Sequence, residues 1–340
     1  MRTSKKIFII LSLIFSIFLF VKTSVKAADI SPDKYYIDVN NGNTIDQKLT
    51  IYANPTITTY TDITINVKGF QKIGESNDRN FYDVDPNNQG EAANWIKLDI
   101  VSAQIAPGKT LVIPWHLKPN LNVGCGTYLA AIAVNEFPHG QAGNTNKIGI
   151  NSTTISQVHI NIIKYNSKLC LNTQTNLNLV EFRTNSILPI FNYDNIPFLT
   201  RIQNNSSFIA QDPRGFIEMF GIGGKITIPF NSQNLDIYAN SVRAFEDTWT
   251  DSSYPHNGNF FEILFYELAH FKFGQYEARL GVTNNVTNTI QDKIYIWIIP
   301  WRVMLVLLIL LLILLFFINK IFISPIRRSN RLNKKKNKKK

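Results

Sequence analysis

The sequence predicts an all-β fold of two tandem immunoglobulin-like β-sandwiches, followed by one C-terminal transmembrane α-helix. The sandwiches are indicated by two successive series of short segments that alternate apolar and polar residues and are separated by Asn, Asp, Gly and Pro. The helix is indicated by a long uncharged apolar run near the C-terminus. About 270 residues lie between the two apolar ends of the chain, a length that suits two domains.

The first sandwich is predicted over residues 28–170, from seven segments with period-two alternation. They are 35–39, 47–52, 61–67, 95–100, 110–117, 127–134 and 154–163. A loop is expected at 135–152, between the last two strands, and loops on a rigid sandwich commonly carry binding residues. Its residues Phe137, Pro138, His139 and Gln141 are therefore a candidate partner-contact loop, with an inert loop as the alternative.

The second sandwich is predicted over residues 171–299, where the same pattern restarts. Its segments are 179–184, 198–203, 215–220, 225–230, 241–249, 275–282 and 293–299. An aromatic insertion at 251–273 interrupts it. We expect a short helix or hairpin at the lipid interface, with Phe261, Leu264, Phe265 and Leu268 on its apolar side. The alternative is that these side chains complete the domain core.

Both halves contain the pattern Gly-x-Tyr-x-Ala at the start of their penultimate strand, as GTYLA at 126–130 and GQYEA at 274–278. A glycine eases a tight entry into a strand, and a tyrosine hydroxyl can bond back onto the backbone, as in the tyrosine corner of immunoglobulin-like domains. The shared position of the pattern favours a repeat over a chance match.

The N-terminus predicts a signal peptide over residues 1–27. Basic residues precede an apolar run from 7 to 20, and the small residues Val25 and Ala27 suit cleavage after Ala27. The run is short for a membrane core, which needs about 20 apolar residues. A retained N-terminal anchor is the alternative.

The C-terminus predicts a transmembrane helix over residues 300–323 and a cytoplasmic tail over 324–340. Trp297 and Trp301 suit the outer membrane interface, and Lys320 can reach the inner one. The tail holds nine Lys and Arg and no acidic residue. Positive residues remain on the cytoplasmic side, so the chain is predicted to be a single-pass cell-membrane protein with its β domains outside.

The charge of the predicted ectodomain argues against nucleic acid as a partner. The whole chain has a net charge of +11, but residues 28–300 contain 19 Lys and Arg against 24 Asp and Glu, a net charge of −5. A mildly acidic surface repels polyphosphates. The tail instead lies beside the lipid bilayer, which is the first expected partner.

The two cysteines, Cys125 and Cys170, are expected to form a disulfide. Both lie in the exported part, where a bridge can persist. In the predicted strand order, Cys125 opens one strand and Cys170 follows its antiparallel neighbour, which brings them to the same end of the sandwich. Two unpaired, buried cysteines are the alternative.

The motifs of enzymes and of metal or cofactor sites are missing from the sequence. It contains no HExxH, paired Cys-x-x-Cys, Gly-x-Ser-x-Gly, phosphate-binding or dinucleotide-binding motif. Glu267 and His270 have a spacing used in carboxylate-bridged metal sites, but such sites need a second copy of the pair. We therefore predict a non-enzymatic protein without catalytic residues, cofactor or metal.

Together these features resemble the WxL-interacting surface proteins of Gram-positive bacteria. The resemblance includes the segments APGKTLVIP at 106–114 and GTYLAAI at 126–132, the two β domains, the single membrane helix and the Lys-rich end. It implies a binding scaffold close to the cell wall, in contact with peptidoglycan or other exported surface proteins. The insertion after Trp249 and the two cysteines depart from the family pattern, so the identity of the partner is not implied.

The predicted function is a membrane-anchored, extracytoplasmic binding or scaffold protein of the bacterial cell surface. The alternative is a chaperone-like factor that offers a strand edge to exported subunits during their assembly. A cell-wall hydrolase is the third class considered, and no motif supports it.

Overall fold

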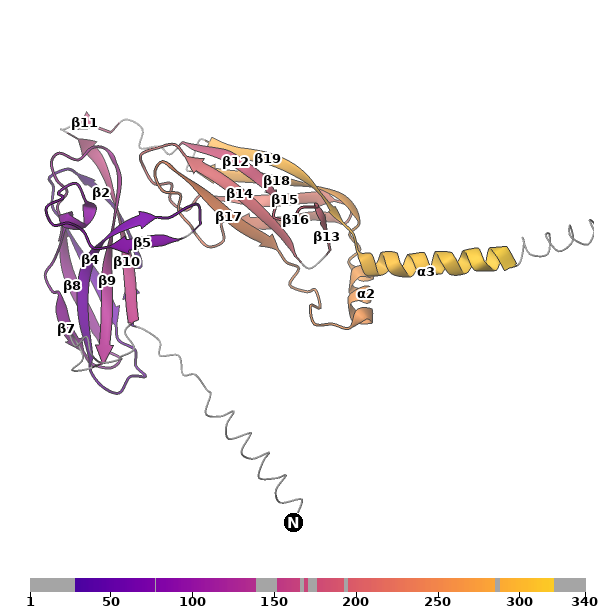
Figure 1. The fold of residues 1–340 in the computed structure, drawn as a ribbon, viewed down its shortest axis with the longest axis horizontal. Helices are drawn as coiled ribbons and strands as arrows, with labels where there is room; N and C mark the ends of the chain where they lie inside the picture. Colours follow the sequence, from indigo (N-terminus) through magenta and orange to yellow (C-terminus); the bar gives the residue numbers. More distant parts are fainter. Residues whose placement is uncertain are drawn as a thin grey trace, which may run out of the picture. The chain divides into compact units, whose positions relative to one another are not determined.

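A computed structural model describes residues 28–76, 78–138, 152–165, 168–170, 176–192, 195–284 and 288–320. The chain forms two compact units (Figure 1). Unit 1 comprises residues 1–71 and 80–170, and unit 2 comprises residues 72–79 and 171–340. The predicted signal peptide at 1–27 and the predicted tail at 324–340 lie outside the described residues.

Unit 1 is a sandwich of two β-sheets with a short 3-10 helix, η1 (Ala92–Trp95). In strand order, the first sheet contains β1 (Asp29–Ser31), β3 (Ile45–Tyr52), β8 (Thr110–Leu117) and β6 (Ile96–Leu98). The second contains β11 (Lys168–Leu169), β10 (Ser152–Tyr165), β9 (Gly126–Pro138), β4 (Thr61–Lys72) and β5 (Arg79–Tyr82). Outside this order, β2 (Lys34–Asn40) pairs in parallel with β10, and β7 (Ser102–Ile105) pairs with β4.

The core of unit 1 forms where the inward residues of both sheets meet. The side chains of Leu49, Trp115 and Ile132 are fully buried there, as expected for alternate residues of strands with one face in the core. The ring of Tyr35 meets that of Trp115 edge-on at a centroid distance of 5.1 Å. Burial of these large side chains supplies the main stabilisation of the unit.

Unit 2 is a second sandwich, with two helices near the C-terminus. Its three-stranded sheet contains β12 (Leu177–Thr184), β14 (Ile196–Asn204) and β17 (Ser241–Trp249). Its five-stranded sheet contains β13 (Ile190–Phe191), β19 (Asn288–Ile298), β18 (Gly274–Asn284), β15 (Arg214–Gly221) and β16 (Gly224–Phe230). The helices are α2 (Phe260–Ala269) and α3 (Trp301–Ile318). The all-β fold class with a C-terminal helix is therefore present.

Helix α2 begins at a capping box. The Asn259 side chain accepts hydrogen bonds from the backbone N–H groups of Phe261 and Glu262, and the Glu262 carboxylate accepts one from the N–H of Asn259. These bonds satisfy donors that the first turn of a helix leaves free. The predicted insertion at 251–273 thus folds as a loop followed by a helix.

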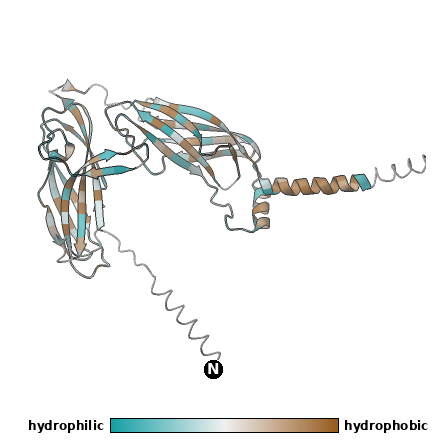
Figure 2. Cartoon of the chain, viewed as in Figure 1, coloured by the Kyte–Doolittle hydropathy of each residue, from teal (hydrophilic) through white to brown (hydrophobic). Residues whose placement is uncertain are grey.

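Helix α3 is long and apolar enough to cross a membrane. Its mean hydropathy is 3.0 over 18 residues, and 6% of the segment is buried. Figure 2 shows hydrophobic residues along most of its length. The helix is shorter than the predicted span of 300–323, although residues beyond 320 are not described.

The predicted strands all overlap observed ones, whereas five short strands were not predicted from the sequence. These are β1, β5, β7, β11 and β13. The expected strand at 95–100 is wrong at both ends, because Trp95 lies in η1 and β6 ends at Leu98. The segment 72–79, predicted as part of the first domain, belongs to unit 2.

Candidate binding groove on the second sandwich

The outer face of the five-stranded sheet of unit 2 carries an open groove. Alternation along β15 directs Ile217 and Met219 into the core, where both are fully buried, and leaves Phe216 on the outside with 56% of its surface exposed. The groove has a volume of about 580 Å³. Its lining consists of Phe216, Glu218, Arg279, Leu280, Gly281, Gln291, Asp292 and Lys293.

The groove is hollow because a glycine faces its exposed aromatic ring. Phe216 on β15 is directly opposite Gly281 on β18, so no side chain fills the space beside the ring. A Cβ added at Gly281 would meet only the carbonyl oxygen of Phe216, at 4.0 Å. Position 281 therefore has room for a side chain, and the groove is open because glycine has none.

The charged side chains around the groove form ion pairs with one another. Glu277 accepts a hydrogen bond from Arg279 at 2.7 Å and lies 3.8 Å from the Lys293 ammonium. The Arg279 hydrogen bond, together with the two positive charges, holds the pKa of Glu277 below its usual value. An aromatic ring beside both carboxylates and cations suits a polar ligand with an apolar face, such as a sugar chain.

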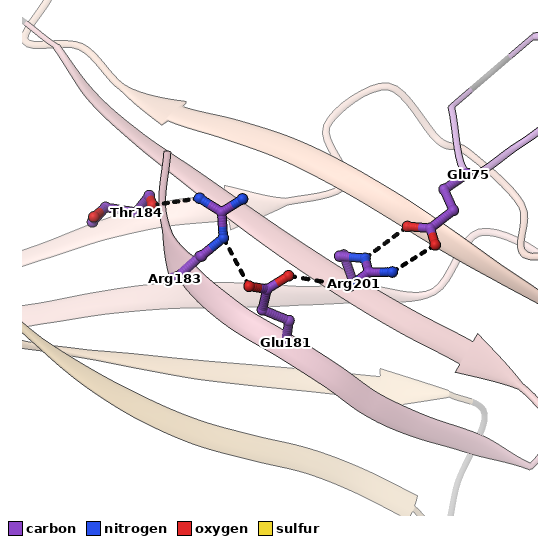
Figure 3. A network of polar contacts seen from close by, with 5 residues as sticks. All are labelled: Glu75, Glu181, Arg183, Thr184 and Arg201. Atoms are coloured by element: carbon purple, nitrogen blue, oxygen red, sulfur yellow. Dashed lines mark hydrogen bonds and ion pairs between the residues drawn. The ribbon is translucent and has the colours of Figure 1, made fainter. Parts of the chain in front are cut away.

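Residues 72–79 contribute a polar network to unit 2 (Figure 3). Arg201 on β14 donates to both carboxylate oxygens of Glu75, at 2.7 and 2.6 Å, and to Glu181 on β12 at 3.3 Å. Glu181 also accepts from Arg183 at 2.8 Å. This bidentate pairing lowers the pKa of Glu75 and raises that of Arg201. The network attaches the segment to the three-stranded sheet.

The same segment bonds to the free edge of β17. The backbone N–H of Ala244 donates to the carbonyl oxygen of Glu75 at 3.0 Å, and the Lys72 ammonium donates to the carbonyl oxygen of Val242. Burial of Lys72, followed by repulsion from Arg243, lowers its pKa to about 8, although Glu75 acts in the opposite direction. An ammonium group therefore loses part of its hydration to make this contact.

Beyond Ala244, the edge of β17 borders a second cavity of about 270 Å³. Backbone groups alternate in direction along an antiparallel strand, so those of Glu246 point to the same edge as those of Ala244. The neighbouring Asp247 carboxylate instead points inward and accepts from the backbone N–H of Asn231 at 3.2 Å. Its burial raises the pKa of Asp247. By the same alternation, the backbone groups of Thr248 also face this edge.

A third polar site joins α2 to the start of α3. The Arg302 guanidinium donates to the Glu267 carboxylate and to the Tyr254 hydroxyl, each at 3.0 Å. The Glu267 side chain is fully buried and that of Arg302 is 16% exposed. Phe260 on α2 meets the Trp301 ring at a centroid distance of 6.3 Å. The first turn of α3 is therefore fixed to the folded unit.

The sulfur atoms of Cys125 and Cys170 are bonded in the structure, with their Cα atoms 5.9 Å apart. Cys125 precedes β9 and Cys170 follows β11. The bridge thus joins residues adjacent to two elements of the second sheet of unit 1.

The candidate contact residues at 137–141 do not lie in a single loop. Phe137 and Pro138 form the end of β9 and pair with Asp62 and Thr61 on β4, which corrects their expected position in the loop 135–152. Phe137 is half-buried. His139 and Gln141 lie outside the described residues. Strand β9 extends beyond the last residue predicted for it, Val134, because β4 provides a pairing partner up to Thr61.

The predicted interface residues lie around α3. Trp297 on β19 is 43% exposed and pairs with Ile190 on β13. Trp301 is the first residue of α3 and is 48% exposed, with the Arg302 guanidinium 4.6 Å from its ring centroid. Lys320 is exposed beyond the end of the helix.

The repeated tyrosines make related but different bonds. Tyr128 donates to the carbonyl oxygen of Gly124, four residues upstream, at 3.2 Å, as expected for a tyrosine corner. Tyr276 donates to the carbonyl oxygen of Ile222 in the β15–β16 turn. Gly126 and Gly274 both have positive φ angles, 144° and 109°, which glycine adopts without steric cost. The shared pattern therefore reflects a similar strand entry.

Among the described residues, no group of His, Cys, Asp and Glu side chains is arranged to hold a metal ion. Glu267 and His270, whose spacing resembles half of a metal site, each have another partner. Glu267 accepts a hydrogen bond from Arg302, and the His270 ring stacks on the Tyr266 ring at a centroid distance of 4.2 Å.

The groove, the polar network and the ion pair of Glu267 all depend on residues far apart in the sequence. Of the features described in this subsection and the previous one, the capping box of α2 is formed by residues close together in the sequence.

No protein-family model matches the chain, and no curated protein sequence matches it. Solved structures with similarity include the YadV chaperone, at 8% identity and a TM-score of 0.38 over 80% of this chain and 100% of that chain. The class 5 fimbriae chaperone CfaA has 12% identity and a TM-score of 0.35, covering 80% and 99%. The Salmonella enterica SafA pilin in complex with the SafB chaperone has 10% identity and a TM-score of 0.34, covering 81% and 98%. This degree of similarity is too low to assign a ligand to this chain.

Proposed function

We propose that the chain is a single-pass membrane protein of the bacterial cell surface, whose β units bind a cell-wall or exported partner outside the membrane. The observation that carries the proposal is the position and exposure of α3. This apolar helix begins three residues after β19 ends at Ile298, and almost all of it is free of contacts with the rest of the described chain. An apolar helix of this kind, uncharged from Val303 to Ile318, is costly in water and stable in lipid.

Protease added to intact cells tests the orientation. We expect the enzyme to digest residues 28–300 and to spare a short fragment that contains α3 and the basic end. A tag at the C-terminus identifies that fragment after electrophoresis. Complete protection of the β units in intact cells, with digestion after lysis, would contradict the proposal.

The groove of unit 2 is the candidate ligand site. Phe216 offers a face on which a sugar ring can stack, while Glu218, Arg279 and Gln291 offer hydrogen-bonding groups. A volume of about 580 Å³ accommodates a small ligand or part of a longer chain. A polysaccharide strand of the cell wall fits this chemistry, although the resemblance to WxL-interacting proteins associates peptidoglycan with the first domain rather than the second.

A filled groove provides the test. Gly281→Gln places a side chain in the hollow without a backbone clash, so we expect unchanged folding and at least about tenfold weaker binding of the purified chain to cell-wall sacculi. A matched control is Tyr52→Ala, which removes an aromatic side chain that is 46% exposed in unit 1. Equal binding by both variants and the unchanged chain would remove the groove from the proposal.

A chaperone-like role is the second candidate function, and the open edge of β17 favours it. An extended segment of an exported protein could pair with Glu246 and place a side chain in the adjacent cavity. Glu246→Pro removes the N–H that points to this edge and leaves the pairing with β14 intact. Loss of co-purified exported proteins in this variant, but not in Glu246→Thr, would support this role over the scaffold role.

A further inference from the structure

Helix α2 has two faces, of which one is not covered by the described chain. Ile263 and Leu264 are buried, with 6% and 7% of their surfaces exposed, and Ile263 belongs to the hydrophobic core of the sandwich. Phe261, Phe265 and Leu268 point away from it, with exposed fractions of 65%, 66% and 50%. Their spacing of four and three residues places them in one stripe along the helix. Large apolar side chains grouped in this way indicate an interaction surface.

The predicted apolar side of the insertion is thus partly corrected. Phe261, Phe265 and Leu268 are on the exposed stripe as expected, whereas Leu264 is buried. The insertion was expected either to contact lipid or to complete the domain core, and these two interpretations concern different faces of the same helix. One face completes the packing of unit 2, and the other is exposed.

The exposed stripe lies next to the point where α3 begins. Glu267, one position before Leu268, holds Arg302 in the first turn of α3, and Phe260, one position before Phe261, contacts Trp301. Val303 is 3% exposed and is the buried residue of α3. Figure 2 shows hydrophobic residues on α2 beside the apolar α3. The stripe therefore lies on a helix whose neighbouring residues contact the first turn of the helix that is proposed to enter the membrane.

We infer that α2 is a lipid-interface helix, whose residues Phe261, Phe265 and Leu268 insert between the head groups of the leaflet that α3 enters. This inference rests on the proposed membrane anchoring of α3. A short helix with one apolar face can lie in the plane of the interface, where aromatic side chains are favoured. The buried ion pair supports this arrangement because it prevents α2 from moving away from α3 without leaving the Glu267 charge unpaired.

Fluorescence quenching in proteoliposomes tests the inference on the full chain. Phe265→Cys is labelled with a polarity-sensitive dye, which is selective because the native cysteines are bonded to each other. The vesicles contain phosphatidylcholine and phosphatidylglycerol, with a lipid whose doxyl quencher lies just below the head groups. We expect roughly a twofold loss of fluorescence relative to vesicles without quencher.

Two further labels separate the possible outcomes. Leu305→Cys reports the insertion of α3, and Phe216→Cys, on the exposed face of β15, serves as the matched control that lipid should not quench. Thermal unfolding of each labelled chain establishes that the fold is retained. Quenching at positions 265 and 305, but not at 216, supports an interfacial α2.

Quenching at 305 alone would overturn the interfacial role of α2 and leave the membrane anchoring intact. Absence of quenching at both positions would overturn the proposed anchoring together with this inference. If the label at 265 is shielded from both the lipid quencher and aqueous iodide, protein covers the stripe. A second copy of the chain or another partner would then replace lipid as its occupant, and the inference would be wrong.

Discussion

At the scale of single residues, Lys72 shows how a contact in this fold depends on pH. Its folded-state pKa is about 8, below the ordinary value of 10.5. Between these two values the unfolded chain binds a proton that the folded chain does not, so the free energy of unfolding rises with pH. The full shift would correspond to about 3 kcal/mol, and partial exposure of the side chain reduces this to about 1–2 kcal/mol.

This increase is measurable by denaturant unfolding of unit 2 between about pH 8 and pH 10.5. The relevant quantity is the difference between the unchanged chain and Lys72→Met, which cancels the titration of other groups. We expect the free energy of unfolding of the unchanged chain to rise relative to that of Lys72→Met as the pH rises. Lys72→Arg is the control, because arginine remains charged throughout this range. An identical pH dependence for the unchanged chain and the Lys72→Arg variant would refute the assignment.

The residues of the groove illustrate what a sequence leaves open at this scale. Phe216 and Gly281 are each ordinary members of an alternating strand, and the pattern of the sequence predicts both strands. Their significance arises from the register that sets them opposite each other, and a register between strands far apart in the sequence has no local signal. In contrast, the sequence places both cysteines next to the strands of one predicted antiparallel pair, which favours a bridge over two unpaired cysteines.

At the scale of elements, the length of a strand determines whether the sequence predicts it. The long strands are evident from their alternation, whereas β11 and β13 contain two residues each and have no measurable period. For α2, Asn259 followed three residues later by Glu262 is a recognisable N-terminal signal. The division of its apolar residues between core and exterior was not predictable, because both faces contain large apolar side chains.

The ion pair between α2 and α3 should contribute strongly to the stability of unit 2. Glu267→Gln leaves the Arg302 charge without its buried partner, and we expect a loss of about 3 kcal/mol in the free energy of unfolding. Arg302→Gln should cost a similar amount. The double variant should recover most of the loss, because neither charge is then buried alone. Unfolding in detergent micelles measures all four chains, and additive losses in the double variant would argue against a coupled pair.

At the scale of the whole molecule, composition and pattern predicted two β units and one apolar helix, but not which residues each unit contains. Residues 72–79 belong to unit 2, although they follow β4 of unit 1. The bonds of Glu75 to Arg201 and Ala244 span more than 120 residues. Contacts of this range depend on tertiary structure, and a single charged residue in a turn does not indicate them.

The junction between the sandwich of unit 2 and α3 leads to a prediction about truncated chains. A chain that ends at Ile299 lacks Arg302 and leaves the Glu267 carboxylate buried without a cation. We expect it to unfold at a lower temperature than a chain that ends at Met304, which retains Arg302 and Val303. Glu267→Gln should reduce the difference between the two truncated chains. Thermal denaturation followed by circular dichroism provides the measurement, and equal melting temperatures would disprove the expectation.

The fixed first turn of α3 also has a mechanical consequence. A membrane protein joined to its anchor by a slack linker swivels freely, and a pull on its outer part only straightens the linker. Here Arg302 and Val303 are built into the folded unit, so the tilt of the anchor follows the orientation of the sandwich to which it is attached. If α3 is the membrane anchor proposed above, a force or torque applied to the sandwich of unit 2 is transmitted to the bilayer through α3 rather than absorbed by a linker.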